Sequence, residues 1–179
     1  MIHLLILILL AVATYVFHNY QAFNDAYLRP WVVEQVNYNR EANPQALCDL
    51  LAPDATLIID DKYTRYRYHI ENGSKTEVCN YLEESARHFQ KPYSEANGYI
   101  WDHLSEYRVD QENWFKDYAD VTFSTEVKMS GGSRDLVTTE GDIMLGKTTT
   151  KMTVKIEIFK DPKITRYEFH RRLTQMPTD

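Results

Sequence analysis

The second half of the chain alternates apolar and polar residues with a period of two, which is the pattern of strands in a half-buried sheet. Successive side chains of a strand point to opposite faces, so the segment "FKDYADVTFSTEVKM" predicts one buried and one solvated face. Its apolar set is Ala119, Val121, Phe123, Val127 and Met129. Two later segments, "TKMTVKIEIFK" and "KITRYEFHRRLT", repeat the pattern on either side of the turn at Asp161-Pro162. The sequence therefore predicts an antiparallel sheet.

Helix signals precede these strands. Pro30 suits the first turn of a helix, so we expect a helix over Pro30–Glu41. Asn43 and Pro44 predict a second, short helix, with Asn43 as its cap. Ser74 and Glu77 form a capping box that begins a third helix. Helices followed by a run of strands predict an α+β domain.

The N-terminus is apolar from Ile2 to Phe17. As a helix this segment is about 24 Å long, slightly short for a hydrocarbon core of ~30 Å. We favour an uncleaved membrane anchor; the alternatives are a signal peptide cleaved near Ala11-Val12-Ala13 and a buried helix. The expected organisation is an anchor or signal segment at 1–19, a linker at 20–29, a domain at 30–174 and a tail at 175–179. We expect the domain to face the periplasm or the extracellular side, or to be secreted after cleavage.

Composition excludes some classes of function. The formal net charge of −6 over 179 residues argues against a nucleic-acid partner, which selects for a basic face. Cys48 and Cys79 form an even pair that is able to bridge outside the cytosol; the alternative is two buried thiols. The sequence has no C-x-x-C pair, no H-x-x-x-H spacing and no Gly-rich phosphate loop. We therefore expect no metal and no cofactor.

Three segments carry a resemblance to a known family: "ALCDLLAPDATLIID", "SKTEVCNYLEE" and "HLSEYRVDQENWFKDYADVTFSTEV". Their order resembles that of the nuclear-transport-factor-two-like superfamily, which includes SnoaL-like and ketosteroid-isomerase-like proteins, and the resemblance covers Pro30 to Leu173. It implies a cystatin-like roll, in which about three helices close a cone-shaped, curved antiparallel sheet around an internal pocket. Members include isomerases, dehydratases, cyclases, binding modules and membrane-anchored secretion components, so the fold alone does not assign a chemistry.

Two residues are candidates for acid–base catalysis. Asp60 ends the apolar run "LAPDATLIIDD", where burial would raise the pKa of a carboxylate; we favour the alternative, a solvated turn with Asp61 and Lys62. In steroid-isomerase-like members the base would fall on Ile59, one residue earlier. In dehydratase-like members a histidine often begins an "H-x-L/M" strand, and His103 matches that position. A His103–Asp60 pair is therefore the catalytic hypothesis.

An aromatic set could line a hydrophobic pocket or form an ordinary core. Its members are Trp31, Tyr38, Trp101, Tyr107 and Phe123. The leading functional prediction is a membrane-tethered or exported domain that binds a small apolar ligand or a protein partner, without catalysis. The alternatives are a cofactor-free isomerase or dehydratase and a scaffold component of an envelope assembly that forms a homodimer through its sheet.

Overall fold

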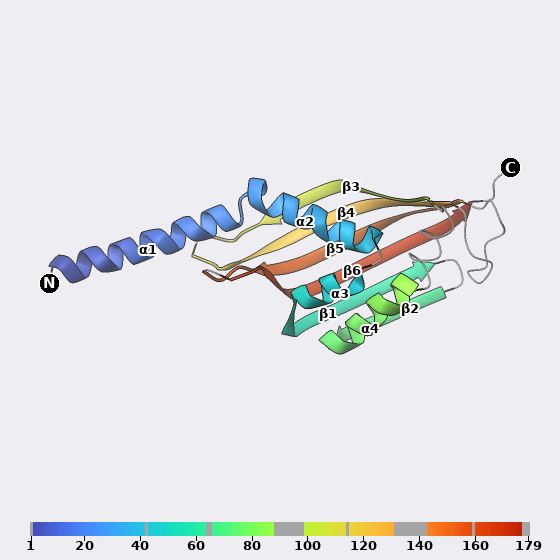
Figure 1. Cartoon of the computed structure of the whole chain (residues 1–179), viewed down its shortest axis with the longest axis horizontal. Helices are drawn as coiled ribbons and strands as arrows, with labels where there is room; N and C mark the ends of the chain where they lie inside the picture. The colour runs from blue at the N-terminus through green and yellow to red at the C-terminus, as the bar shows by residue number, and fades with distance from the viewer. Residues whose placement is uncertain are drawn as a thin grey trace.

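The chain folds as one curved sheet with helices on one side and a projecting N-terminal helix (Figure 1). The computed structural model describes residues 2–41, 43–63, 66–87, 99–113, 115–130, 143–158 and 160–176. The elements in chain order are α1 (Ile2–Ala22), α2 (Asp25–Arg40), α3 (Pro44–Leu50), β1 (Leu51–Tyr63), β2 (Tyr66–Gly73), α4 (Lys75–Ser85), β3 (Tyr99–Asp110), β4 (Tyr118–Ser130), β5 (Ile143–Lys155) and β6 (Lys163–Met176). This order confirms the expected α+β architecture.

The strands form a six-stranded sheet in the order β2-β1-β6-β5-β4-β3. Strands β3 to β6 make an antiparallel meander, and β1 and β2 make a hairpin. The pair β1–β6 is parallel, with Ile59 opposite Phe169, whereas we expected antiparallel pairing. The reason is that β2 and β3 run in the same direction, because α4 carries the chain back between them. The four-strand meander then ends on β6 in the direction of β1.

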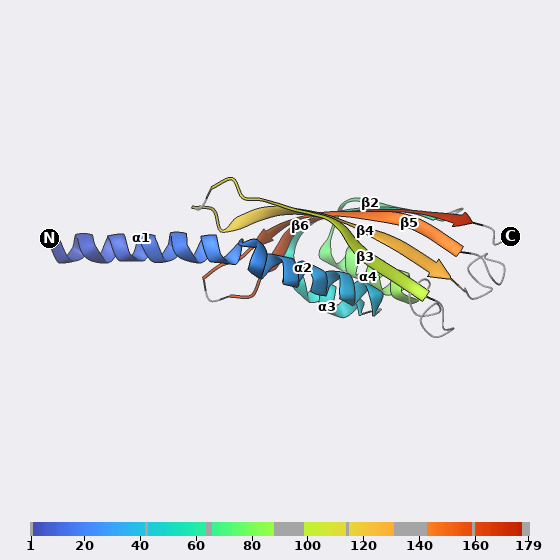
Figure 2. The same ribbon diagram turned by 90° about the horizontal axis from the view of Figure 1, so that it is seen from above.

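Helices α2, α3 and α4 lie against one face of the sheet, which we call the inner face (Figure 2). The opposite, outer face carries no described helix. Alternation along the strands places the core on the inner face, where the following side chains are fully buried: Leu57, Ile59, Val121, Val154 and Ile164 from the strands, and Leu28, Val32 and Val78 from the helices. The expected cone closed by helices is thus confirmed.

Helix α2 begins at Asp25, five residues before the expected start at Pro30. Asn24 explains the difference, because its side chain accepts a hydrogen bond from Ala26 N at 2.8 Å and its carbonyl accepts one from Leu28 N at 2.9 Å. Pro30 lies inside the helix. Residues 20–29, expected as a linker, contribute Phe23 and Leu28 to the core.

The caps of the next two helices follow the sequence prediction. Asn43 accepts a hydrogen bond from Ala46 N at 3.3 Å at the start of α3. Ser74 and Glu77 form the capping box of α4. Cys48 of α3 and Cys79 of α4 are joined by a disulfide, with their Cα atoms 5.6 Å apart. The bridge fixes two short helices to each other on the inner face.

Helix α1 projects away from the sheet as a rod (Figures 1 and 2). Every described side chain from Ile2 to Thr14 is exposed, and burial begins at Tyr15 and reaches completion at Asn19. By length and composition alone, α1 could cross a membrane.

Candidate functional site

Two recesses lined by described residues lie on the outer face of the sheet. One, of about 220 Å³, lies over β4, β5 and β6 and is lined by Asp120, Val121, Thr122, Lys151, Met152, Thr153, Arg166 and Glu168. The other, of about 450 Å³, lies over β3 and β4 and is lined by Glu106, Tyr107, Arg108, Asp110, Asp120 and Thr122. Most of the lining residues are charged, with both signs present, or carry a hydroxyl group. Asp120 and Thr122 line both recesses.

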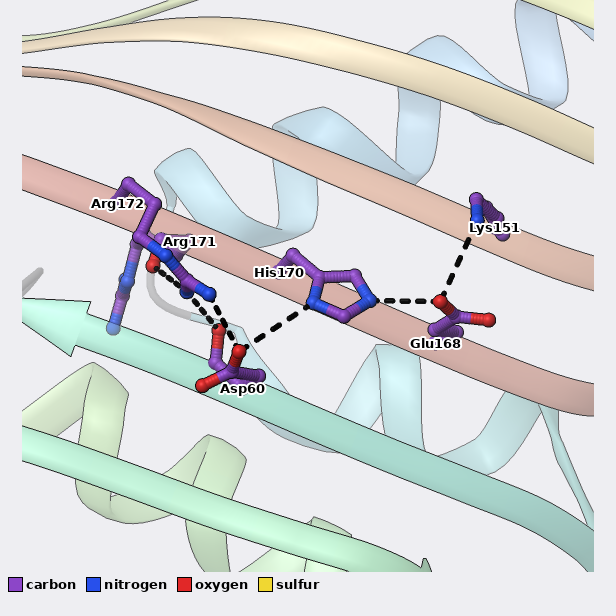
Figure 3. Close-up of polar contacts among 6 residues, drawn as sticks. All are labelled: Asp60, Lys151, Glu168, His170, Arg171 and Arg172. Atoms are coloured by element: carbon purple, nitrogen blue, oxygen red, sulfur yellow. Dashed lines mark hydrogen bonds and ion pairs between the residues drawn. The ribbon is translucent and has the colours of Figure 1, made fainter.

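A chain of polar contacts runs along β1, β6 and β5 beside the smaller recess (Figure 3). Arg172 donates to the Asp60 carboxylate and, at 2.9 Å, to the Asp60 carbonyl. His170 Nε2 lies 2.8 Å from Glu168 Oε1, and Lys151 Nζ lies 3.5 Å from the same oxygen. Parallel pairing aligns Asp60 with His170, and antiparallel pairing aligns Lys151 with Glu168. Strand register therefore assembles this network from three strands.

The acids of this network are held in their charged form. The hydrogen bond from Arg172 lowers the pKa of Asp60 below its usual range. The hydrogen bond from His170, assisted by the charge of Lys151, lowers the pKa of Glu168. A carboxylate with a lowered pKa is a weak proton acceptor near neutral pH. The arrangement suits electrostatic recognition better than proton transfer.

The structure does not bring the backbones of the predicted catalytic pair together. Asp60 lies on β1 and His103 on β3, and β6, β5 and β4 lie between these strands. Four strand spacings separate them by about 19 Å along the sheet. The backbone of His103 is paired with Glu126, and its side chain lies outside what the structure describes. Catalytic roles for the two residues stay predictions.

A second cluster of charged groups is buried on the inner face, beneath α4. Arg171 Nε donates to Asp61 Oδ1 at 2.8 Å and Arg171 Nη2 donates to Asp61 Oδ2 at 2.5 Å. Tyr81 donates to Asp61 at 2.7 Å, and Arg171 also donates to Ser85 at 3.1 Å. The exposed fraction of the Asp61 side chain is 0% and that of Arg171 is 6%. Such a bidentate pair satisfies both charges inside the cone.

Burial also shifts the tyrosines around this cluster. Loss of solvent raises the pKa of Tyr81 well above its usual value, and it likewise raises the pKa of Tyr167. Tyr68 stacks on Tyr81 with ring centroids 4.8 Å apart. The hydroxyls of Tyr81 and Tyr167 therefore stay protonated at neutral pH, and that of Tyr81 donates its hydrogen bond to Asp61.

Sequence reasoning missed the buried cluster. The favoured solvated turn at Asp60, Asp61 and Lys62 is wrong, because β1 continues to Tyr63. The alternation that made Leu57 and Ile59 inward-facing also made Asp61 inward-facing. On β6 the aligned residues Tyr167, Phe169 and Leu173 enclose Arg171 at the same parity. The alternation of inward and outward side chains along β1 and β6 could therefore have predicted that Asp61 and Arg171 are buried.

The predicted aromatic set is distributed between core and surface. Phe123 is buried, and Trp31 and Tyr107 pack partly buried against the core. Burial raises the pKa of Tyr107 to about 12, and Arg29 lies over its ring at 5.9 Å. Tyr38 instead donates to Glu34 at 2.6 Å at an exposed position.

The side chain of Trp101 lies outside the described part of the structure, so the aromatic set as a ligand pocket stays a prediction. Among the residues that the structure describes, no three His, Cys, Asp or Glu side chains form a cluster that could hold a metal ion.

Comparison with known proteins identifies the fold. No family model and no curated protein matches the chain. A scytalone dehydratase-like protein from Novosphingobium aromaticivorans has a TM-score of 0.53 at 13% identity, covering 85% of this chain and 87% of that one. The β subunit of benzoate 1,2-dioxygenase from Burkholderia mallei has a TM-score of 0.53 at 9% identity, covering 83% and 91%.

Nuclear transport factor 2 from Cryptosporidium parvum is similar to the same extent, with a TM-score of 0.52 at 11% identity and coverage of 80% of this chain and 90% of that one. At these identities the similarity concerns architecture alone. The curved sheet, the helices on its inner face and these three structures together show that the chain has the fold of the nuclear-transport-factor-two-like superfamily.

Proposed function

We propose that this protein is a membrane-tethered, non-catalytic module that binds a protein partner on the outer face of its sheet, and that the partner is a second copy of this chain. The observation that carries the proposal is the segregation of charge on that uncovered face. The domain faces the periplasm or the extracellular side in this proposal.

The outer face divides into two halves of opposite charge. On β5 and β6 the described outward side chains are mainly cationic: Lys147, Lys151, Lys155, Arg166 and Arg172, with the carboxylate Glu168. On β3 and β4 they are mainly anionic: Glu106, Asp110, Asp120 and Glu126, with the cation Arg108. A two-fold axis between β4 and β5 would set each half against its opposite on the other copy. Isologous interfaces require this self-complementarity.

The ion pairs already present on this face do not oppose such an interface. Lys147 and Glu106 are 3.0 Å apart with exposed fractions of 49% and 67%, and exposed pairs of this kind contribute ~1 kcal/mol or less. They can exchange partners on association. The mainly polar lining of the smaller recess also fits protein side chains better than a small apolar ligand.

The inner face supports the non-catalytic part of the proposal. Asp61, Arg171, Tyr81 and Ser85 form one hydrogen-bonded cluster on the inner face, where the resemblance implied an internal pocket. A carboxylate held by a bidentate arginine is not free to accept a proton from a substrate. Phe123 of β4 is buried in the core, and Trp31 of α2 packs against it.

Two features support the tether and its side, and a third supports a role in assembly. The apolar side chains of α1 from Ile2 to Leu10 are exposed, which is costly in water and favourable in lipid. The Cys48–Cys79 bridge fits an oxidising compartment. One similar structure is itself a subunit of a larger enzyme, and this fits a role in assembly.

The test is site-specific cross-linking of the full-length protein in its membrane. With Cys48 and Cys79 bridged, a Thr149→Cys variant has one free thiol, on β5 at the centre of the outer face. We expect a short bifunctional maleimide to yield a covalent dimer. A Thr149→Cys/Lys151→Glu variant should yield much less, because the reversal puts acid against acid.

The matched control is Glu34→Cys, at an exposed position of α2 on the helical side. It should remain monomeric under the same conditions. Equal cross-linking of the two positions, or none at Thr149→Cys, would overturn the proposed interface.

A further inference from the structure

We infer that the described part of the β3–β4 loop, residues 111–113 and 115–117, is a second membrane contact that inserts the ring of Phe115 into the lipid–water interface beside α1. This rests on the proposed tether and adds to it a specific surface of the folded domain. The chemical partner is the boundary between lipid headgroups and acyl chains.

The exposed apolar surface of α1 continues up to the domain. The side chains from Ile2 to Thr14 are exposed, and Phe17, on the turn that meets the domain, is also exposed. Lipid that covers this apolar surface therefore reaches the turn that contains Tyr15. The end of the domain that contacts Tyr15 therefore lies at the bilayer surface.

The loop is the part of the domain that makes this contact. The Tyr15 hydroxyl donates to the Phe115 carbonyl at 3.2 Å, joining positions 100 residues apart in sequence. Figure 1 shows the β3–β4 connection at the end of the sheet from which α1 projects. Tyrosine at a membrane boundary keeps its ring in the apolar region and its hydroxyl in the polar region. Phe115 is therefore at interfacial depth whenever α1 spans.

The loop presents Phe115 in a fixed conformation. Phe115 N donates to the Asn113 side chain at 3.0 Å, and Lys116 N donates to the Asn113 carbonyl at 3.2 Å. Gln111 donates from its side chain to the Lys116 carbonyl at 3.2 Å. These bonds close a turn that leaves 65% of Phe115 exposed. Among the described residues, Phe115 is thus a large apolar ring that does not belong to the hydrophobic core.

The surroundings have the composition of an interfacial belt. Phe17 and Tyr20 of α1, also well exposed, follow Tyr15 within two turns. Lys116 lies next to Phe115, over the ring of Tyr118 at 5.3 Å, where its ammonium can reach lipid phosphates. Aromatic rings with a flanking cation are enriched at this depth of a bilayer. Glu112, 3.8 Å from Lys116, keeps the site from being purely cationic, so we expect ring insertion to dominate.

The experiment measures depth at three positions of the full-length protein in vesicles of phosphatidylethanolamine and phosphatidylglycerol. The variants Phe115→Cys, Leu7→Cys and Glu84→Cys each carry one free thiol, labelled with an environment-sensitive fluorophore. Lipids that are spin-labelled at the headgroup or along the acyl chain then quench by depth. Glu84, at an exposed position of α4, lies on the helical side and outside the proposed interface between copies, and is the reference for water.

We expect strong quenching at position 115 by lipids labelled near the headgroup, quenching at position 7 by lipids labelled deep in the chain, and none at position 84. Quenching at position 7 with position 115 as unquenched as position 84 would overturn the inference and leave the tether intact. An unquenched position 7 would instead overturn the tether, and the loop contact with it.

Discussion

Strands β1 and β6 carry two adjacent Asp–Arg ion pairs, one on each face of the sheet. Asp60 and Arg172 pair on the outer face, where 47% of the Arg172 side chain is exposed. Asp61 and Arg171 pair on the inner face with almost no exposure. Successive residues of a strand point to opposite faces. The two neighbouring ion pairs therefore differ in their exposure to water within one molecule.

We predict that Arg171→Met lowers the free energy of unfolding by about 3–5 kcal/mol, because it leaves the buried Asp61 carboxylate without its cation. Thermal and denaturant unfolding of the full-length protein would measure the loss. The double variant Asp61→Leu/Arg171→Met should lose less than the two single variants added together, since it leaves no unpaired buried charge.

The outer pair supplies the control for that prediction. Arg172→Met should cost clearly less than Arg171→Met, because 47% of Arg172 and 16% of Asp60 are exposed, so that water can partly replace the lost cation. Equal losses for Arg171→Met and Arg172→Met would show that burial of the inner pair has been misjudged.

At the scale of elements, the sequence predicted most of the strands from their alternation of apolar and polar residues, and the starts of α3 and α4 from their capping residues. The Asn43 cap, the Ser74–Glu77 capping box, the alternating strands and the α+β order are all present. The start of α2 at Asp25 was missed because a side-chain cap at Asn24 outweighs the helix-starting preference of Pro30. The parallel β1–β6 pair was missed because strand direction depends on a distant crossover, which no local pattern contains. The sequence analysis named Asp60 as a candidate base, and that role stays a prediction. It missed the buried pair of Asp61 and Arg171, because the charges of Asp60 and Asp61 were assumed to mark the end of the strand.

The disulfide between α3 and α4 gives the prediction at this scale. It closes a sequence separation of 31 residues, which on the chain-entropy argument stabilises the fold by roughly 3–4 kcal/mol. We expect a reductant to lower the melting temperature of the wild type. A Cys48→Ser/Cys79→Ser variant should melt at the lower temperature already and should not respond to reductant. A wild type indifferent to reductant would contradict the prediction.

At the scale of the whole molecule, three carboxylates of the outer face are stabilised in their charged form by basic side chains. Hydrogen bonds from Arg172, His170 and Lys147 lower the pKa of Asp60, Glu168 and Glu106 respectively. In the unfolded chain these acids return to ordinary values near 4. Their contribution to stability is therefore complete above those values and is lost as pH falls through the lower, folded-state values.

We predict that Glu168→Gln flattens the acid end of the stability profile, since the glutamine has no proton to take up. Melting temperatures between pH 7 and pH 3 would measure it. Glu71→Gln, at an exposed position of β2, is the matched control and should follow the wild type. A Glu168→Gln curve parallel to that of the wild type would refute the linkage.

The junction of α1 with the domain has a consequence for how two copies meet. Only Phe23 and Asn24 interrupt the helices there, and Phe23 is packed in the core. If α1 spans a membrane as proposed, this short connection holds every domain at a similar height and tilt above the lipid. Two copies would then meet by diffusion in two dimensions and in similar orientations, so that weak electrostatic matching between their outer faces would favour the proposed dimer.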